Sequence, residues 1–337
     1  MMNVEHHFPF QKKFNRLVIG FTTLLSVIFI ASLMLGIIPI GLDELFHYFS
    51  SSDTSIHFTI SLRFQREIIA LCCGGMLALG SAIIQGLTRN PMVAPDLTGM
   101  TSVGCLFVVV CEMIWIKSPV LNLFLGVAGA FLGFLLCFSL TSRIRNRLTV
   151  ILTGISISFT ANAIMQLFIL HAKEDIANYL HFITGSLYAV NGISVWIVFV
   201  ITLMIVPLVF MLGRRFSVVS LDDQTCYSLG VPLQKYWITY FFLASLLVGT
   251  SIIGVGHLGF LGIISPNMAR MLIGNRPQYI FPLSFLIGGF TYLLADTIGR
   301  CIISPAEIPA GIITNMMSAP VFLYILFRYY RGQHEWN

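Results

Sequence analysis

The sequence predicts an all-α, polytopic integral membrane protein with about ten transmembrane helices. Of its 337 residues, 57% are hydrophobic and only 10% are charged, whereas an average soluble domain carries roughly 25% charged residues. The apolar residues are grouped in long blocks, and a helix of about 20 apolar residues crosses the hydrocarbon core of a bilayer. The net charge of +5 does not indicate nucleic-acid binding, because the basic residues are spread singly between the apolar blocks.

Nine blocks are long enough to be membrane spans, and a shorter one adds a tenth. The first block has no A-x-A cleavage site after it, so we expect a retained helix rather than a signal peptide. The short block at 258–274 is interrupted by glycine and proline, which is tolerated at membrane depth only where protein or a water-filled cavity covers the backbone. The other predicted spans are 17–38, 68–87, 100–116, 120–140, 149–170, 193–212, 236–255, 279–299 and 310–327.

The distribution of basic residues predicts the orientation. With the N-terminus in the cytoplasm, 14 of the 19 Lys and Arg residues fall on the inner side, as the positive-inside rule requires. Both termini are therefore expected inside, which needs an even number of crossings. We expect a cytoplasmic segment at 1–16, one transmembrane domain at 17–330 and a cytoplasmic tail at 331–337.

Three of the basic residues expected outside lie at the ends of predicted helices: Arg63, Arg66 and Arg300. Arg63 and Arg66 are three positions apart and therefore share one helical face. Two interpretations are open. The side chains anchor helix ends at the membrane interface, or they bind a partner outside the cell.

Motifs for catalysis and metal binding are absent from the sequence. It contains no G-x-x-x-x-G-K-[ST] loop for nucleotide phosphates, and the span interiors nearly lack the ionisable residues that a proton relay needs. Seven cysteines without a C-x-x-C spacing and the isolated His257 indicate no metal site. We therefore expect a chain that is not an enzyme and holds no cofactor, so any uphill transport must be driven by a partner.

Three irregular segments stand out. In the first, 63–99, two prolines forbid a regular helix through 90–99. The second is the inner loop 214–235, where Ser220 and Asp223 have the spacing of a capping box and Gly230 supplies a helix stop, so a short helix is expected at 221–229. The third, 254–270, is rich in glycine and contains Pro266.

Together these segments resemble the permease subunits of bacterial ABC importers for iron–siderophore, haem and vitamin B12. That pattern reads approximately R-x-P-R, then G-x-x-x-Q-x-x-x-x-N-P-L-A-x-P-x-x-L-G, L-G-x-x-x-A-x-x-L-G and G-x-I-x-F-V-G-L-x-x-P-H-x-x-R. Asn267 replaces its usual histidine, and His257 stands where a small residue or proline is common. Besides the arginine pair, the matching residues are Gln85, Asn90, Pro91, Pro95, Gly99, Gly259, Gly262, Pro266 and Arg270.

The resemblance implies a ten-helix permease of the type II ABC importer fold in the bacterial cytoplasmic membrane. It would pair with a second permease, identical or different, above two ATPases that use the ATP, and would receive ligand from an extracellular binding protein. The favoured cargo is an iron–siderophore, ahead of haem and cobalamin. The resemblance assigns Arg63, Arg66 and Arg300 to binding-protein docking, and Asp222, Asp223, Ser228, Leu229 and Gly230 to ATPase coupling.

Polar residues at helical spacing suggest a lining for the translocation path. Ser158, Asn162 and Gln166 share one face of their helix, as do Thr314 and Ser318 of the last helix, and the resemblance places both helices beside the path. Interhelical hydrogen bonding is the alternative interpretation. Because this lining carries no fixed charge, we expect the permease to discriminate weakly between chelates.

Two other classes of function fit the sequence less well. A secondary transporter of a small organic solute should show inverted-repeat halves and charges at the midplane, and neither is visible in the sequence. A membrane scaffold or receptor without transport activity would not need a capped inner helix.

Overall fold

The computed structural model describes residues 8–36, 39–41, 54–114, 118–141, 147–171, 179, 182–187, 191–221, 223–303 and 306–334. Regular structure in these residues is helical throughout. The elements are α1 (Phe8–Met34), α3 (Thr54–Leu87), the 3-10 helix η2 (Asp96–Thr98), α4 (Met100–Ile114), α5 (Pro119–Thr141), α6 (Arg147–His171), α8 (Gly192–Val219), α9 (Asp223–Ser228), α10 (Leu233–Val255), α11 (Leu261–Ile273), α12 (Pro277–Ile302) and α13 (Ala310–His334).

Ten of these helices account for the ten predicted spans. Seven are long and apolar enough to cross a membrane: α1, α3, α5, α6, α8, α10 and α12. The apolar stretches of α4, α11 and α13 are shorter, and α11 is the interrupted element expected at 258–274. The largest difference is in α3, which begins at Thr54 instead of residue 68. The reason is that its charged residues are paired inside the bundle, so they do not end the helix.

The helix α3 forms the centre of the bundle. It contacts α12, α10, α8 and α11, and 89% of its most apolar stretch is buried, against 17% in α1 and α6. Small residues allow the close packing: a Cβ added to Gly74 would lie 2.7 Å from the carbonyl oxygen of Gly288 on α12. Close contacts between the backbones of neighbouring helices therefore stabilise the bundle together with side-chain packing.

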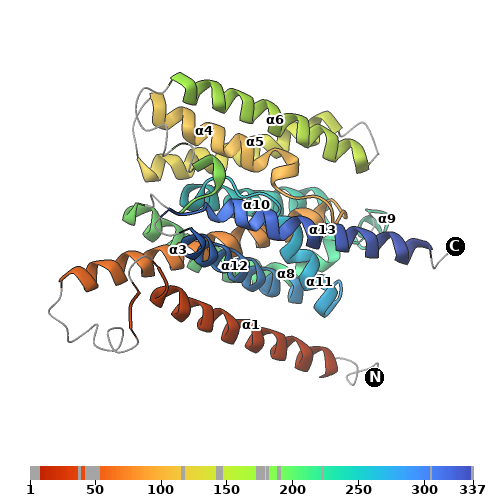
Figure 1. The fold of residues 1–337 in the computed structure, drawn as a ribbon. Coiled ribbons are helices and arrows are strands. Elements are labelled where there is room, and N and C mark those ends of the chain that lie inside the picture. The colour runs from red at the N-terminus through yellow and green to blue at the C-terminus, as the bar shows by residue number, and fades with distance from the viewer. Residues whose placement is uncertain are drawn as a thin grey trace.

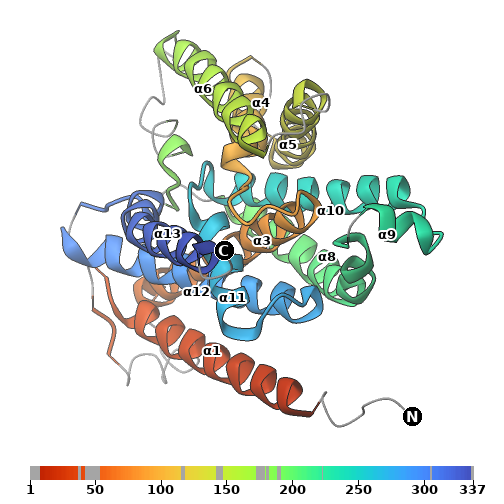
Figure 2. The same cartoon turned by 90° about the vertical axis from the view of Figure 1, so that its right-hand side faces the viewer.

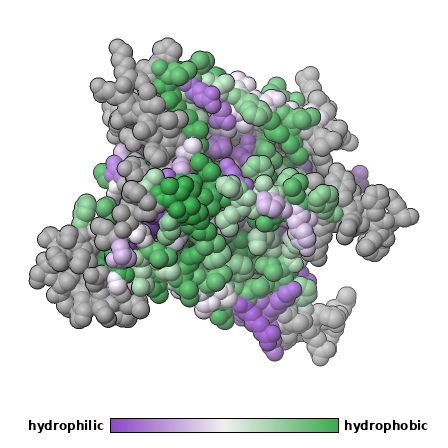
Figure 3. Space-filling model, in the orientation of Figure 1, coloured by the Kyte–Doolittle hydropathy of each residue, from purple (hydrophilic) through white to green (hydrophobic). Residues whose placement is uncertain are grey.

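The outer surface is that of a membrane protein. On α1, Ile19 and Val27 are 62% and 64% exposed, and an apolar surface of this extent is unfavourable in water. Figure 3 shows hydrophobic residues across the middle of the visible face and hydrophilic residues gathered over the first turns of α1. The start of α1, the end of α13 and α9 all lie at one end of the bundle, whereas α12 ends at the opposite one (Figure 1).

Candidate functional site

The first and third irregular segments interlock. The side-chain amide of Gln85 on α3 donates to the carbonyl oxygen of Gly262 at 3.4 Å, and Ser81 donates to the same oxygen. The Arg270 guanidinium of α11 in turn donates to Gln85 Oε1. Backbone groups freed by an interrupted helix need such partners at membrane depth, so the sequence motifs mark two segments that satisfy each other.

The loop between α3 and η2 is irregular, as the prolines predicted. Asn90 Oδ1 accepts the N–H of Met92 at 3.0 Å, and Pro95 O accepts the N–H of Met100 at 2.9 Å. Gly99 then turns the chain into α4 with a φ of +81°. The result is a break between two membrane helices that local hydrogen bonds close in part.

Asn267, which replaces the usual histidine of the resemblance, is a cross-link between these segments. Its side-chain amide donates to Pro91 O at 2.9 Å and to Ile263 O at 2.8 Å. Its Oδ1 accepts a hydrogen bond from Arg270 at 3.1 Å. The Asn267 amide thus provides both the donor and the acceptor for the hydrogen bonds that join the two segments.

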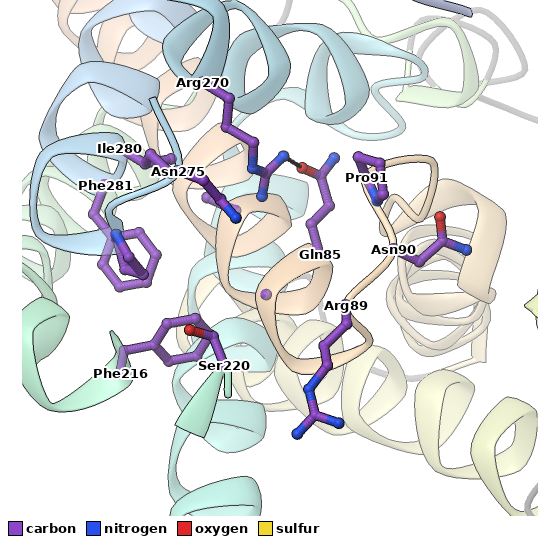
Figure 4. Close-up of a pocket in the computed structure, with 13 residues that line it drawn as sticks. Gln85, Arg89, Asn90, Pro91, Phe216, Ser220, Arg270, Asn275, Ile280 and Phe281 are labelled. Atoms are coloured by element: carbon purple, nitrogen blue, oxygen red, sulfur yellow. Dashed lines mark hydrogen bonds between the residues drawn. The ribbon is translucent and has the colours of Figure 1, made fainter. Parts of the chain in front are cut away.

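A cavity of about 320 Å³ opens beside the interlocked segments. It is lined by Gln85 and Arg89 from the first segment, Arg270 from the third, and Phe216 and Ser220 from the end of α8. Figure 4 shows Arg270 and Gln85 pointing toward each other across it, while Arg89 extends away from this pair. The cavity therefore separates the motif residues from the point where α8 gives way to α9.

The short helix α9 forms as the sequence predicted, with its own anchors. The thiol of Cys226 is buried and donates to Val218 O at 3.2 Å, which fastens α9 to α8. Gly230 follows with a φ of +67°, the left-handed conformation expected of a glycine that stops a helix. Leu229 is 62% exposed and Ser228 is exposed beside it, so an apolar side chain faces out at the end of a polar helix.

The capping-box prediction was wrong for Ser220. This residue ends α8: its N–H donates to Phe216 O, and its hydroxyl donates to Ser217 O at 2.9 Å. The hydroxyl is therefore engaged with the preceding helix and does not cap α9. Asp222 and the side chain of Asp223 lie outside the described part of the chain.

At the opposite end of the bundle, six charged residues form what we call the outer charge cluster: Arg63, Arg66, Glu67, Asp296, Arg300 and Glu307. Asp296 is 1% exposed, and its carboxylate lies 2.8 Å from Nη2 of Arg66 and 3.1 Å from Nε of Arg300. Nη1 of Arg66 also lies 2.8 Å from the Glu307 carboxylate. The cluster joins α3 to α12 and to the loop that precedes α13.

The cluster also reaches α1. Arg63 donates to Leu33 O at 2.8 Å, and Arg300 donates to Ser32 and lies 3.8 Å from Glu67. Sequence reasoning singled out the three arginines but missed their carboxylates. The spacing held a signal, because Glu67 follows Arg63 by four residues and Asp296 precedes Arg300 by four.

The predicted path residues are not brought to one surface. On α6, Ser158 and Asn162 are half-buried and Gln166 is exposed, whereas Thr314 and Ser318 on α13 are fully buried. Thr314 donates to Gly311 O within its own helix at 2.9 Å. The exposed polar residue of this part of α13 is Asn315.

One ionisable residue that the sequence did not assign, Asp96, lies close to this lining. Asp96 in η2 accepts the backbone N–H of Phe260 through Oδ2 at 3.4 Å, and its carbonyl oxygen accepts the Ser158 hydroxyl at 2.6 Å. An ionisable residue therefore lies beside a path lining for which the sequence predicted only uncharged polar residues.

Comparisons with known proteins agree with this architecture. A model of the FecCD transport family matches residues 24–328. The Fe(3+)-citrate import system permease protein YfmE of Bacillus subtilis is 34% identical over 90% of this chain and 92% of its own length. The hemin transport system permease protein HmuU of Yersinia pestis is 29% identical over 93% and 96%. A solved inward-facing metal-chelate type ABC transporter superposes with a TM-score of 0.78 at 26% identity, covering 93% of this chain and 99% of that one.

Proposed function

Since this chain belongs to the FecCD transport family, we propose that it is the permease subunit of an ATP-driven bacterial importer that carries a ferric chelate across the cytoplasmic membrane. The observation that carries the proposal is the full-length agreement of sequence and fold: the family match spans 24–328 and the likeness to a metal-chelate transporter covers 93% of the chain. The chain itself is not an enzyme, and the ATP is used by separate ATPase subunits.

In this proposal α9 is the coupling helix that docks on an ATPase. Its support is its position at the end of the bundle where α1 begins and α13 ends (Figure 2), together with the exposed Leu229. The basic first turns of α1 support a cytoplasmic location for the same end. The assembly would contain two such permeases and two ATPases.

The outer charge cluster is the proposed docking site for the extracellular binding protein. Arg66 and Arg300 are held by carboxylates of their own chain, so an acidic partner has to compete for them. The pair of Arg66 with Glu307 is the least buried pair of the cluster, since 16% and 18% of these side chains are exposed against 1% of Asp296, and it is the proposed place for such an exchange. Rim charges of this kind govern orientation and association rate more than affinity.

In this proposal α6 and α13 border the translocation path. Ser158, Asn162 and Gln166 retain their assigned role, and the exposed Asn315 takes the place of the buried Thr314 and Ser318. Among cargoes we favour ferric citrate, because the 34% identical relative is a Fe(3+)-citrate permease. Hydroxamate siderophores and haem follow, as named for relatives at 30% and 29% identity.

Uptake of ⁵⁵Fe-citrate in cells that depend on this permease tests the proposal. Uptake should require the chain, an ATPase with an intact nucleotide site, and the binding protein. The matched control carries an ATPase variant that binds but does not hydrolyse ATP. Uptake that continues at the same rate with that variant would instead support a secondary transporter.

A further inference from the structure

A second cavity, of about 300 Å³, lies between the end of α8 and the start of α10. The hydroxyl of Tyr240 on α10 donates to Leu212 O on α8 at 2.9 Å, which joins the two helices at this cavity. The proposed function gives the cavity no role. Its lining residues are Leu212, Arg215, Pro232, Lys235, Tyr236, Thr239 and Tyr240.

The cavity carries positive charge without a carboxylate to balance it. Among the described residues, those that line it include Arg215 and Lys235 but no Asp or Glu. Both cations are exposed, and neither forms an ion pair within the described part of the chain. Two cations that line one cavity suit an anionic ligand, because Arg and Lys bind phosphate and carboxylate oxygens through charge-assisted hydrogen bonds.

Both cations lie where their helices leave the apolar part of the membrane. Arg215 is in the last two turns of α8 and Lys235 is in the first turn of α10, and both helices are long and apolar enough to span. Tyr236 fits the same level, since tyrosine is enriched at membrane–water interfaces. Figure 2 shows α9 and these two helix ends at one edge of the bundle. The cavity therefore lies at the level of lipid headgroups.

Exposed apolar side chains continue from each cation toward the middle of the membrane. On α8, Met211 and Leu208 precede Arg215 by four and seven positions, and therefore share its helical face. On α10, Phe242 follows Lys235 by seven positions, again on one face. These three apolar residues are 79%, 44% and 52% exposed, respectively. The acyl chains of a phospholipid would cover these rows, whereas a soluble anion would leave them uncovered.

We propose that this cavity binds the headgroup of an anionic phospholipid of the inner leaflet. The phosphate lies between Arg215 and Lys235, and the acyl chains follow the apolar rows of α8 and α10. Basic pockets between membrane helices on the cytoplasmic side bind anionic headgroups in this way. The volume of about 300 Å³ is at the lower limit of ligand pockets, about 300–1,000 Å³, which suits a headgroup rather than a whole lipid. The choice of the inner leaflet rests on the proposed function.

The test measures lipid binding to the purified permease–ATPase complex by native mass spectrometry. The probe is phosphatidylglycerol, and phosphatidylcholine with the same acyl chains is the reference without net charge. The wild-type complex should retain phosphatidylglycerol in preference. Arg215→Gln and Lys235→Gln should each weaken its binding about fivefold, and together about 25-fold, as expected for two basic residues near a membrane surface.

Arg214→Gln is the matched control, because Arg214 is exposed beside Arg215 but is not among the residues that line the cavity. It should change phosphatidylglycerol binding less than twofold. Equal losses for Arg214→Gln and Arg215→Gln would show a diffuse surface charge instead of a site, and a wild-type complex without preference would also overturn the inference.

Two other occupants are separated by the same preparation. Displacement of phosphatidylglycerol by millimolar glycerol phosphate would show that a soluble anion takes the cavity. Loss of the ATPase from the Arg215→Gln, Lys235→Gln variant, with either lipid, would show that an acidic surface of the ATPase covers it. Each result would overturn the lipid site. Iron uptake that does not depend on ATP would overturn the proposed function instead, and the measured preference for phosphatidylglycerol would stand.

Discussion

Replacing Asp296 with asparagine should destabilise the permease far more than replacing Glu307 with glutamine. Asp296 is 1% exposed and receives two arginines, so its loss leaves Arg66 and Arg300 short of a buried counter-charge. Removing one partner of such a pair costs about 3–5 kcal/mol. Glu307→Gln removes only the second partner of Arg66, which keeps Asp296, and the pair that is lost is partly exposed, at 18% and 16% of the two side chains. Its cost should therefore approach the value of about 0–1 kcal/mol that exposed pairs contribute.

The assay is the apparent melting temperature of the purified complex, followed by the loss of its monodisperse size-exclusion peak. At about 2 °C per kcal/mol for a chain of this size, Asp296→Asn should lower the midpoint by about 6 °C or more, and Glu307→Gln by about 2 °C or less. In the double variant Arg66→Gln with Asp296→Asn, the drop in melting temperature should be smaller than the sum of the drops in the two single variants, because one uncompensated arginine has been removed. Equal shifts for Asp296→Asn and Glu307→Gln would refute the burial argument.

Three further predictions concern the docking and path residues. Gly230→Val should abolish stimulation of the ATPase by loaded binding protein. Gly230 has a φ of +67° and open space around it, so the cost of the valine is backbone strain of about 1–2 kcal/mol. Gly230→Asn is the control, because asparagine tolerates that conformation, and equal stimulation in both variants would contradict the coupling role. Arg63→Gln should weaken capture of loaded binding protein in a pull-down without lowering the melting temperature by more than about 2 °C; undiminished capture would argue against docking at this end. Asn162→Leu should slow uptake of ferric citrate and of a neutral trihydroxamate by the same factor, and a change in their ratio would show that this residue discriminates.

The helices were predictable because apolar length alone decides whether a segment spans a membrane. Where the prediction failed, the deciding partner was distant in sequence. The charged start of α3 stays helical since Arg66 pairs with Asp296, 230 positions away. Ser220 has the spacing of a helix cap, yet it ends α8 instead of starting α9. A local sequence pattern does not show how far the preceding helix extends.

The motif residues of the candidate site were predictable from the sequence, but the directions in which their side chains point were not. Gln85 and Arg270 were selected from the sequence, and the structure adds that they bind each other. Helical periodicity placed Thr314 and Ser318 on one face, but it does not tell which side that face is turned to, and both proved buried. The role of Asp96 was not predictable, because the backbone N–H that it accepts belongs to Phe260, 164 positions further along the chain.

The interlocked segments also bear on how the protein is made. Ser81 and its acceptor Gly262 are 181 positions apart, which corresponds to about 9–36 s of synthesis at about 5–20 residues per second. During that interval the break after α3 sits in the membrane without the side chains that later close it. Its polar groups must be kept with the insertion machinery or with water until α11 emerges from the ribosome. Truncated chains that end before residue 261 should therefore be recognised by membrane quality control, although they already contain most of the spanning helices.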